Sequence, residues 1–198
     1  MSRNAVIVLL ISVSLWSCSE TKKSSGDAHF SEGEYNKAAA EYTNELKFNP
    51  NDVTALYNRG RAYEEQGKFE EAKKDFEKAL EINPNNFQVL LSLANLHHNE
   101  KNYTNALLFA NRAAEIPGAP AMASFMKGRA LHQLGKPDEA LKAYDNAIHL
   151  DKEFGQAYYN RGLLKIAKKN VKGACIDLQL ATGLEYPGAD EAYKKYCN

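Results

Sequence analysis

Apolar residues in the stretch Val53–Pro84 fall into two blocks with helical spacing, separated by the polar triplet Gln66-Gly67-Lys68. Side chains that recur every three or four residues lie on one face of a helix, so the pattern predicts two amphipathic helices joined by a short turn. Pro84 is expected to end the second helix, because proline disfavours the helical conformation of the residue before it, here Asn83.

Small and large residues are combined across this predicted helix pair. Gly60 and Ala72 are small where the two helices must approach closely, and Tyr63 and Phe76 are large enough to fill the space that close approach leaves. The combination predicts a tightly packed helix–turn–helix unit.

The same small residues recur along the chain with a period of 34 residues. They are Gly60, Ala94, Gly128 and Gly162, then Ala38, Ala72, Ala106, Ala140 and Ala174, then Ala79, Ala113, Ala147 and Ala181. No insertion disturbs the register across five units, 19–52, 53–86, 87–120, 121–154 and 155–188. A generic bundle of alanine-rich helices would not keep one fixed period, so the pattern indicates a repeat architecture.

These positions resemble the tetratricopeptide repeat (TPR), a 34-residue helix–turn–helix unit with small residues at positions 8, 20 and 27. Leu56 occupies position 4, where tryptophan is usual in the family. The resemblance implies an all-α fold, a right-handed α-solenoid of about five repeats over 26–188, in which each repeat contacts its neighbours. The polar residues before residue 26 predict that the first helix of the first repeat is shortened. Residues 189–198 are expected to form a C-terminal capping helix.

The amino-terminal residues 1–17 resemble a secretory signal peptide, with one charge, Arg3, before the largely apolar run Ala5–Trp16. This run is too short to span a bilayer as a helix. It ends at Leu15-Trp16-Ser17-Cys18, which resembles the bacterial lipoprotein box and implies acylation of Cys18, with 18–25 as the tether. That interpretation predicts a lipid-anchored protein of the bacterial cell envelope, at the outer membrane facing the periplasm. The alternative is an ordinary signal peptide followed by an unmodified cysteine.

The chain carries 25 basic and 25 acidic residues, so its net charge is zero. A protein that binds nucleic acid electrostatically would show a basic face or stripe. We therefore expect no nucleic-acid partner.

Residues that line the concave face in TPR proteins come from positions 2, 5, 6, 9, 12 and 13 of the first helix of each repeat. The resemblance implies that this chain contacts a protein or peptide partner there through Tyr57, Asn58, Arg61, Leu91, Asn95, His98, Phe125, Arg129, His132, Tyr159 and Asn160. Such a mixture can hydrogen-bond an extended backbone and accommodate apolar side chains. The alternative is a solvated surface without a partner. The carboxylate clamp of chaperone-binding repeats is incomplete, since no lysine occupies positions 2, 5 or 9 of repeats two to five.

No motif indicates catalysis: the sequence lacks a glycine-rich phosphate loop, an HExxH motif and a paired-cysteine zinc pattern. His97 and His98 are adjacent, so on a helix they point about 100° apart. His98 and His132 share a repeat position, which separates them by on the order of 10 Å. We expect no enzyme activity, no cofactor and no metal site.

Three functions remain open. The first is a membrane-anchored scaffold that binds a partner on its concave face. The second is an accessory subunit of an envelope or secretion complex, held by its convex face or by its repeat ends. The third is a glycan-binding lipoprotein, for which Tyr57, Phe125 and Tyr159 would provide stacking platforms.

Cys175 and Cys197 are the cysteines that follow Cys18. They lie at similar distances on either side of a turn near Glu185-Tyr186, so two antiparallel helices would bring them to the same height. Export would place them where disulfides persist. We expect a disulfide that fixes the capping helix to the last repeat, with two free buried thiols as the alternative.

Overall fold

The computed structural model describes residues 24–197, and every regular element in this range is an α-helix. The predicted signal peptide 1–17 and Cys18 lie outside the described residues. The helices are α1 Ser25–Ser31, α2 Tyr35–Phe48, α3 Val53–Glu65, α4 Phe69–Ile82, α5 Phe87–Asn99, α6 Tyr103–Glu115, α7 Ala121–Gln133, α8 Pro137–Leu150, α9 Gly155–Ala167, α10 Val171–Gly183 and α11 Ala189–Cys197.

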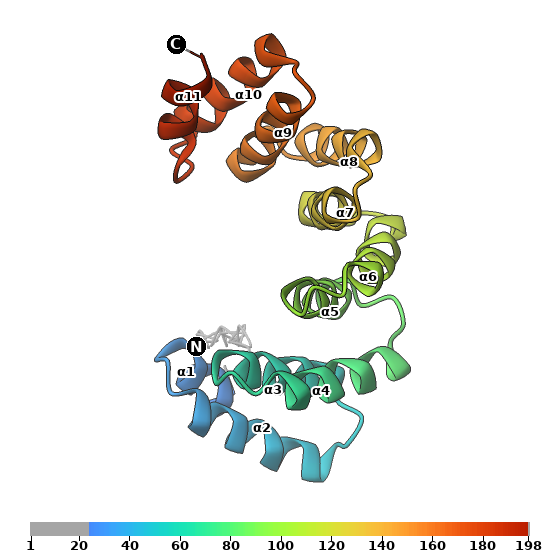
Figure 1. Cartoon of the computed structure of the whole chain (residues 1–198). Helices are drawn as coiled ribbons and strands as arrows, with labels where there is room; N and C mark the ends of the chain where they lie inside the picture. The colour runs from blue at the N-terminus through green and yellow to red at the C-terminus, as the bar shows by residue number, and fades with distance from the viewer. Residues whose placement is uncertain (1–23, 198) are drawn as a thin grey trace, which may run out of the picture.

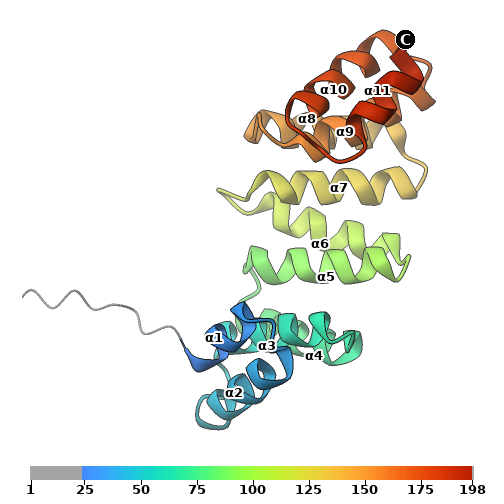
Figure 2. The same cartoon turned by 90° about the vertical axis from the view of Figure 1, so that its left-hand side faces the viewer.

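Helices α1 to α10 form five consecutive antiparallel pairs, and α11 packs after the last pair (Figure 1). The pairs follow one another along an arc whose inner side is lined by the odd-numbered helices. Figure 2 looks onto this inner side, where α3, α5 and α7 lie one above another. The all-α solenoid predicted from the 34-residue period is therefore confirmed, and α1 is short, as the polar residues before it predicted.

Turns within the repeats require a left-handed residue at position 15. Gly33, Gly67 and Gly135 have positive φ angles of 77°, 73° and 71° there. Lys101 and Lys169 occupy the same position in repeats three and five, with φ angles of 60° and 63°. The backbone geometry is thus kept even where the sequence does not supply glycine, at a local cost for a residue with a Cβ atom.

The packing within each repeat depends on position 8 of the first helix and position 24 of the second. An added Cβ atom would lie 2.5 Å from Phe76 at Gly60 and 2.6 Å from Tyr144 at Gly128. These distances are too short for real contacts, so glycine is required beside the large rings. Ala94 and Ala110 replace the two partners in repeat three, where both residues are buried.

Buried side chains from neighbouring repeats form a nearly continuous core along the arc. Leu91 and Phe109 pack against both of the larger clusters and so connect them. This arrangement is typical of solenoids, in which stability comes from contacts between adjacent repeats.

A disulfide joins Cys175 on α10 to Cys197 at the end of α11, with the two Cα atoms 5.6 Å apart. This is the pairing expected from the antiparallel register of the two helices. It links the capping helix covalently to the last repeat.

None of the helices within residues 24–197 is long and apolar enough to cross a membrane.

Candidate functional site on the concave face

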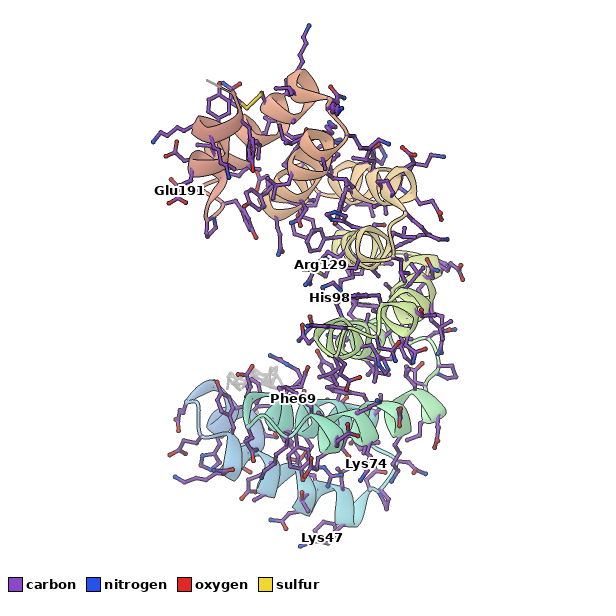
Figure 3. All side chains as sticks on the ribbon, in the orientation of Figure 1. Lys47, Phe69, Lys74, His98, Arg129 and Glu191 are labelled. Atoms are coloured by element: carbon purple, nitrogen blue, oxygen red, sulfur yellow. A yellow bond between two sulfur atoms is a disulfide. The ribbon has the colours of Figure 1, made fainter. Side chains whose placement is uncertain are left out.

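The concave face is formed by the first helices of the repeats, α1, α3, α5, α7 and α9 (Figure 1). His98 on α5 and Arg129 on α7 lie on its inner side (Figure 3). Most of the predicted contact residues are at least partly exposed, namely Tyr57, Asn58, Arg61, Leu91, Asn95, His98, Arg129, His132, Tyr159 and Asn160.

Phe125 is the exception, and its prediction as an accessible contact is wrong. Its side chain is only 1% exposed, because it packs against Phe154 and Tyr144 at centroid distances of 5.0 and 5.8 Å. Phe154 stands at position 34 of its repeat, where the other described repeats carry Asp52, Asn86, Pro120 and Gly188. A large ring from this position covers Phe125 and removes it as a stacking platform for a ligand.

His98 and Arg129 form the centre of the concave face. The His98 ring contacts Tyr103 edge-on at 5.3 Å, and the Arg129 guanidinium lies 5.9 Å from the centroid of Phe125. Burial, and then the positive charge of Arg129, lower the pKa of His98 below its ordinary value. The imidazole is therefore biased toward the neutral form, which can both donate and accept a hydrogen bond.

At the amino-terminal end of this face, the predicted contact residue Asn58 is already used within the chain. Its Nδ2 donates to Asp27 Oδ1 at 3.1 Å, and the Tyr42 hydroxyl donates to the same oxygen at 2.7 Å. The Arg61 guanidinium lies 4.7 Å from the Phe30 centroid. These side chains, with Ser31, line a pocket of about 220 Å³.

At the carboxy-terminal end, Tyr159 packs on Tyr186 at 5.1 Å and lines a pocket of about 280 Å³. Glu191 and Lys195 from the capping helix complete this pocket, and Glu191 lies at the inner side of the arc (Figure 3). The predicted set did not include these two residues, because the capping helix has no counterpart in the repeat pattern.

Glu64 on α3 was likewise not among the predicted contacts. Burial raises its pKa to about 7, against a smaller opposing effect of Arg61 and a small additional effect of Glu65. Its position 12 in the repeat is one of the concave positions, but no feature of the sequence indicated its burial.

Two ion pairs within repeats were also missed. Arg59 makes two hydrogen bonds of 2.7 Å to Asp75, and Arg161 donates to Asp177 from Nε at 2.8 Å. Each pair joins position 7 to position 23, and this separation of 16 residues is a signal that the sequence did contain. Asp75 and Asp177 are buried, so the pairs hold the helices together rather than facing a ligand.

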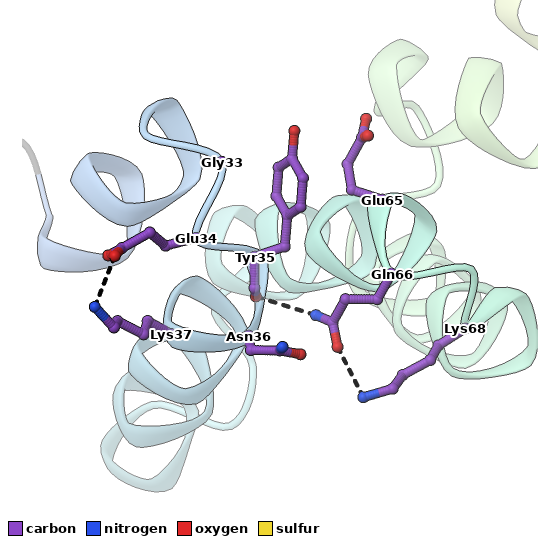
Figure 4. A pocket seen from close by; sticks show the side chains of 8 residues that line it. All are labelled: Gly33, Glu34, Tyr35, Asn36, Lys37, Glu65, Gln66 and Lys68. Atoms are coloured by element: carbon purple, nitrogen blue, oxygen red, sulfur yellow. Dashed lines mark hydrogen bonds and ion pairs between the residues drawn. The ribbon is translucent and has the colours of Figure 1, made fainter.

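A pocket of about 510 Å³ lies outside the concave centre, at the turns between α1 and α2 and between α3 and α4 (Figure 4). Several of its polar groups are already paired: Gln66 Nε2 donates to the Tyr35 carbonyl at 3.0 Å, and Lys37 contacts Glu34 at 2.7 Å. Potential metal ligands of His29, Glu32 and Glu34 lie nearby within 4.8 Å of one another. Glu34 Oε2 contacts His29 Nδ1 at 2.6 Å, so this group forms a polar junction between elements.

Comparisons with known families agree with this architecture. A tetratricopeptide repeat model matches residues 53–86, and a second TPR model matches 26–67 and 128–167. The model for anaphase-promoting complex, cyclosome, subunit 3 matches 74–147. No curated protein sequence is significantly similar to the chain.

Several solved structures share the fold. MamA is 24% identical with a TM-score of 0.73, and the match covers 83% of this chain and 96% of MamA. YrrB, described as a TPR protein with an unusual peptide-binding site, is 28% identical with a TM-score of 0.69 over 85% of this chain and 88% of YrrB. A tetratricopeptide repeat protein from Parabacteroides merdae is 25% identical with a TM-score of 0.64, and the match covers 87% of this chain and 68% of that protein. The repeat period, the paired helices and these matches together establish that the chain belongs to the tetratricopeptide repeat proteins.

Proposed function

We propose that this protein is a scaffold whose concave face binds an extended segment of a protein partner. The observation that carries the proposal is the state of Asn95 and Arg129, both at position 9 of their repeats. Neither side chain makes a hydrogen bond or ion pair with another described residue, although both are partly buried on the concave face. An extended segment offers carbonyl and carboxylate groups that could accept from them.

The arginines of the chain divide by repeat position in a way that supports this proposal. Arg59 and Arg161, at position 7, form ion pairs with buried aspartates. All four arginines lie over aromatic rings, but Arg61 and Arg129, at position 9 and over Phe30 and Phe125, make no ion pair with a described residue. Stacked guanidinium groups keep their hydrogen-bond donors available, so position 9 is suited to contact a partner.

Anchoring at a membrane is a further part of the proposal. It rests on the sequence around Cys18, which lies outside the described residues. Acylation at that cysteine would hold the solenoid at the bacterial outer membrane, facing the periplasm. Replacing Cys18 with serine should release or stall the protein in cell fractionation. Identical fractionation of variant and parent, with no fatty acid on the parent, would contradict the anchor.

Partner binding by the concave face can be tested by capturing cross-linked partners from cells that express the double variant Tyr57→Ala/Arg129→Ala. Recovery of the cross-linked partner should fall at least about tenfold, as expected for loss of two central contacts. The matched control is Lys74→Ala/Lys142→Ala, which alters exposed residues on the second helices. Equal partner recovery with both double variants would exclude the concave face as the binding site.

A second candidate function has one observation in its favour. Ile176 and Leu180 on α10 are 54% and 44% exposed and lie one helical turn apart. Apolar residues exposed in this way suit an accessory subunit that is held by its last repeat. Loss of partner recovery in Ile176→Lys/Leu180→Lys, with the concave double variant unaffected, would favour this alternative.

A further inference from the structure

A tyrosine and an asparagine recur together at two places, three repeat periods apart. Tyr42 and Tyr144 both occupy position 24, and Asn58 and Asn160 both occupy position 6 of the following repeat. The other internal repeat junctions combine Phe76 with Ser92 and Ala110 with Met126. The chain therefore contains two copies of one arrangement of donors, at opposite ends of the solenoid.

In the first copy, a carboxylate occupies the place between the two donors. Asp27 Oδ1 accepts from the Tyr42 hydroxyl at 2.7 Å and from Asn58 Nδ2 at 3.1 Å. Asp27 stands at position 9 of its repeat. The structure thus shows which chemical group satisfies this pair of donors.

In the second copy, the chain supplies no such acceptor. Position 9 of that repeat is Arg129, and the Tyr144 hydroxyl oxygen is buried without a hydrogen-bond partner among the described residues. The Tyr144 side chain is 0% exposed. Asn160 Nδ2 donates instead to the Gln156 carbonyl of its own helix, at 2.8 Å. The second copy therefore has the same two hydrogen-bond donors as the first, but an arginine stands where the first copy has a carboxylate.

We propose that a carboxylate of the partner segment binds between Arg129, Tyr144 and Asn160, in the place that Asp27 fills in the first repeat. This inference rests on the proposed function of the concave face and specifies the chemistry of its partner. The hydroxyl of Tyr144 would gain its missing partner, and the Arg129 guanidinium would neutralise the incoming charge.

Arg129 is suited to this role because no polar group of the described chain holds its guanidinium. It is partly exposed and makes no hydrogen bond or ion pair with a described residue. The Tyr144 oxygen is covered in the free chain, so a bound carboxylate must displace a side chain above it. The proposed donor set contains no lysine, in contrast to the clamp that binds chaperone tails.

The probe for this inference is a library of random nine-residue peptides, selected on the full chain and then synthesised as matched sets. Each selected peptide is made with its acidic residues intact, with Glu→Gln or Asp→Asn replacements, and with a free or amidated C-terminus. Binding is measured by fluorescence anisotropy. The replacements show whether a side-chain or a terminal carboxylate is recognised.

Removing the carboxylate should weaken binding at least about tenfold, the size expected for a charge-assisted hydrogen bond. Tyr144→Phe and Arg129→Met should each weaken binding of the acidic peptide by a larger factor than binding of its amide counterpart. The control is Lys142→Ala, which alters an exposed residue on α8 and should change neither. Arg129→Asp should abolish acidic-peptide binding and raise the unfolding temperature, because it reproduces the Asp27 arrangement.

Two results would overturn the inference, and only one of them would also contradict the proposed function. Peptides that bind the concave face without any preference for a carboxylate would contradict the Tyr144 site and leave the proposed function intact. A library that yields no binder of the concave face would contradict both.

Discussion

Gly60 and Phe76 fit together only because residue 60 has no side chain: an added Cβ atom would lie 2.5 Å from Cε1 of the ring. The same relationship joins Gly26 to Tyr42 and Gly128 to Tyr144. The third repeat solves the crossing differently, with Ala94 in the first helix and Ala110 in the second. A glycine beside a ring and an alanine beside an alanine are thus two solutions to one packing problem.

Gly60→Ala should therefore lower the free energy of unfolding by about 1–3 kcal/mol, the usual cost of overpacking. Adding Phe76→Ala should cost less in this background than in the parent, because the pair then resembles Ala94 and Ala110. Gly183→Ala is the control, since no atom outside the local backbone of its own helix lies within 4 Å of its added Cβ. Denaturant unfolding of the four variants measures these differences, and strict additivity of the two core substitutions would contradict the packing argument.

Tyrosine-to-phenylalanine substitutions at residues 42 and 144 should differ in their effects on stability. Tyr42→Phe removes a hydrogen bond to Asp27 and should cost about 1–2 kcal/mol. Tyr144→Phe removes a buried hydroxyl without a described partner and should leave stability unchanged or raise it by about 1 kcal/mol. Thermal unfolding of both variants provides the comparison. Equal losses would show that the Tyr144 hydroxyl is satisfied in the free chain.

Glu64 should make the stability of the chain depend on pH. Its pKa is raised from 4.5 to about 7 in the folded protein, so the folded state binds more protons than the unfolded state between these values. The stabilising contribution is complete below pH 4.5 and is lost as the pH rises through about 7. The free energy of unfolding should accordingly fall over this interval.

Glu64→Gln should remove this dependence and raise stability at pH 8 by about 1–2 kcal/mol relative to the parent. Its exposed neighbour supplies the control, Glu65→Gln, which should retain the parent's pH profile. Denaturant midpoints measured from pH 4 to pH 8 test the pair. Parallel profiles for the parent and Glu64→Gln would show that the carboxyl is not buried in solution.

The Cys175–Cys197 disulfide should stabilise the carboxy-terminal end of the solenoid. It closes a loop with a sequence separation of 22 residues, which corresponds to about 3 kcal/mol in the chain-entropy model. Reductant should lower the unfolding temperature of the parent and expose the amides of α11 to hydrogen exchange. Cys175→Ala/Cys197→Ala should show the lower temperature with or without reductant. A parent that does not respond to reductant would contradict the stabilising role.

The sequence predicted those features that depend on the repeat period alone. The close approach at Gly60 follows from this register, and the pairing of Cys175 with Cys197 follows from their similar distances to the turn between two antiparallel helices. The burial of Phe125 could not be predicted in this way, because it depends on the size of Phe154, a residue from a variable position. Register places a side chain on a face, whereas its neighbours decide whether it is accessible.

The contacts of Asp27 and Glu191 escaped prediction for a related reason. Both lie in terminal elements, the shortened α1 and the capping helix α11, where the repeat pattern is weakest. Asn58 was predicted to contact a partner, and its bond to Asp27 depends on an acidic residue that only the first described repeat carries at position 9. Individual polar partners therefore required the structure.

Site-specific photo-cross-linking in intact cells can show whether a partner binds on the concave face. A photoreactive amino acid is placed singly at Tyr57, Asn95 and His132 on the first helices, and at Lys74 and Lys142 on the second helices. One partner should be cross-linked from the three concave positions, and Arg129→Ala should weaken this product. Cross-linking of that partner from Lys74 and Lys142, with none from the concave positions, would contradict binding on the concave face.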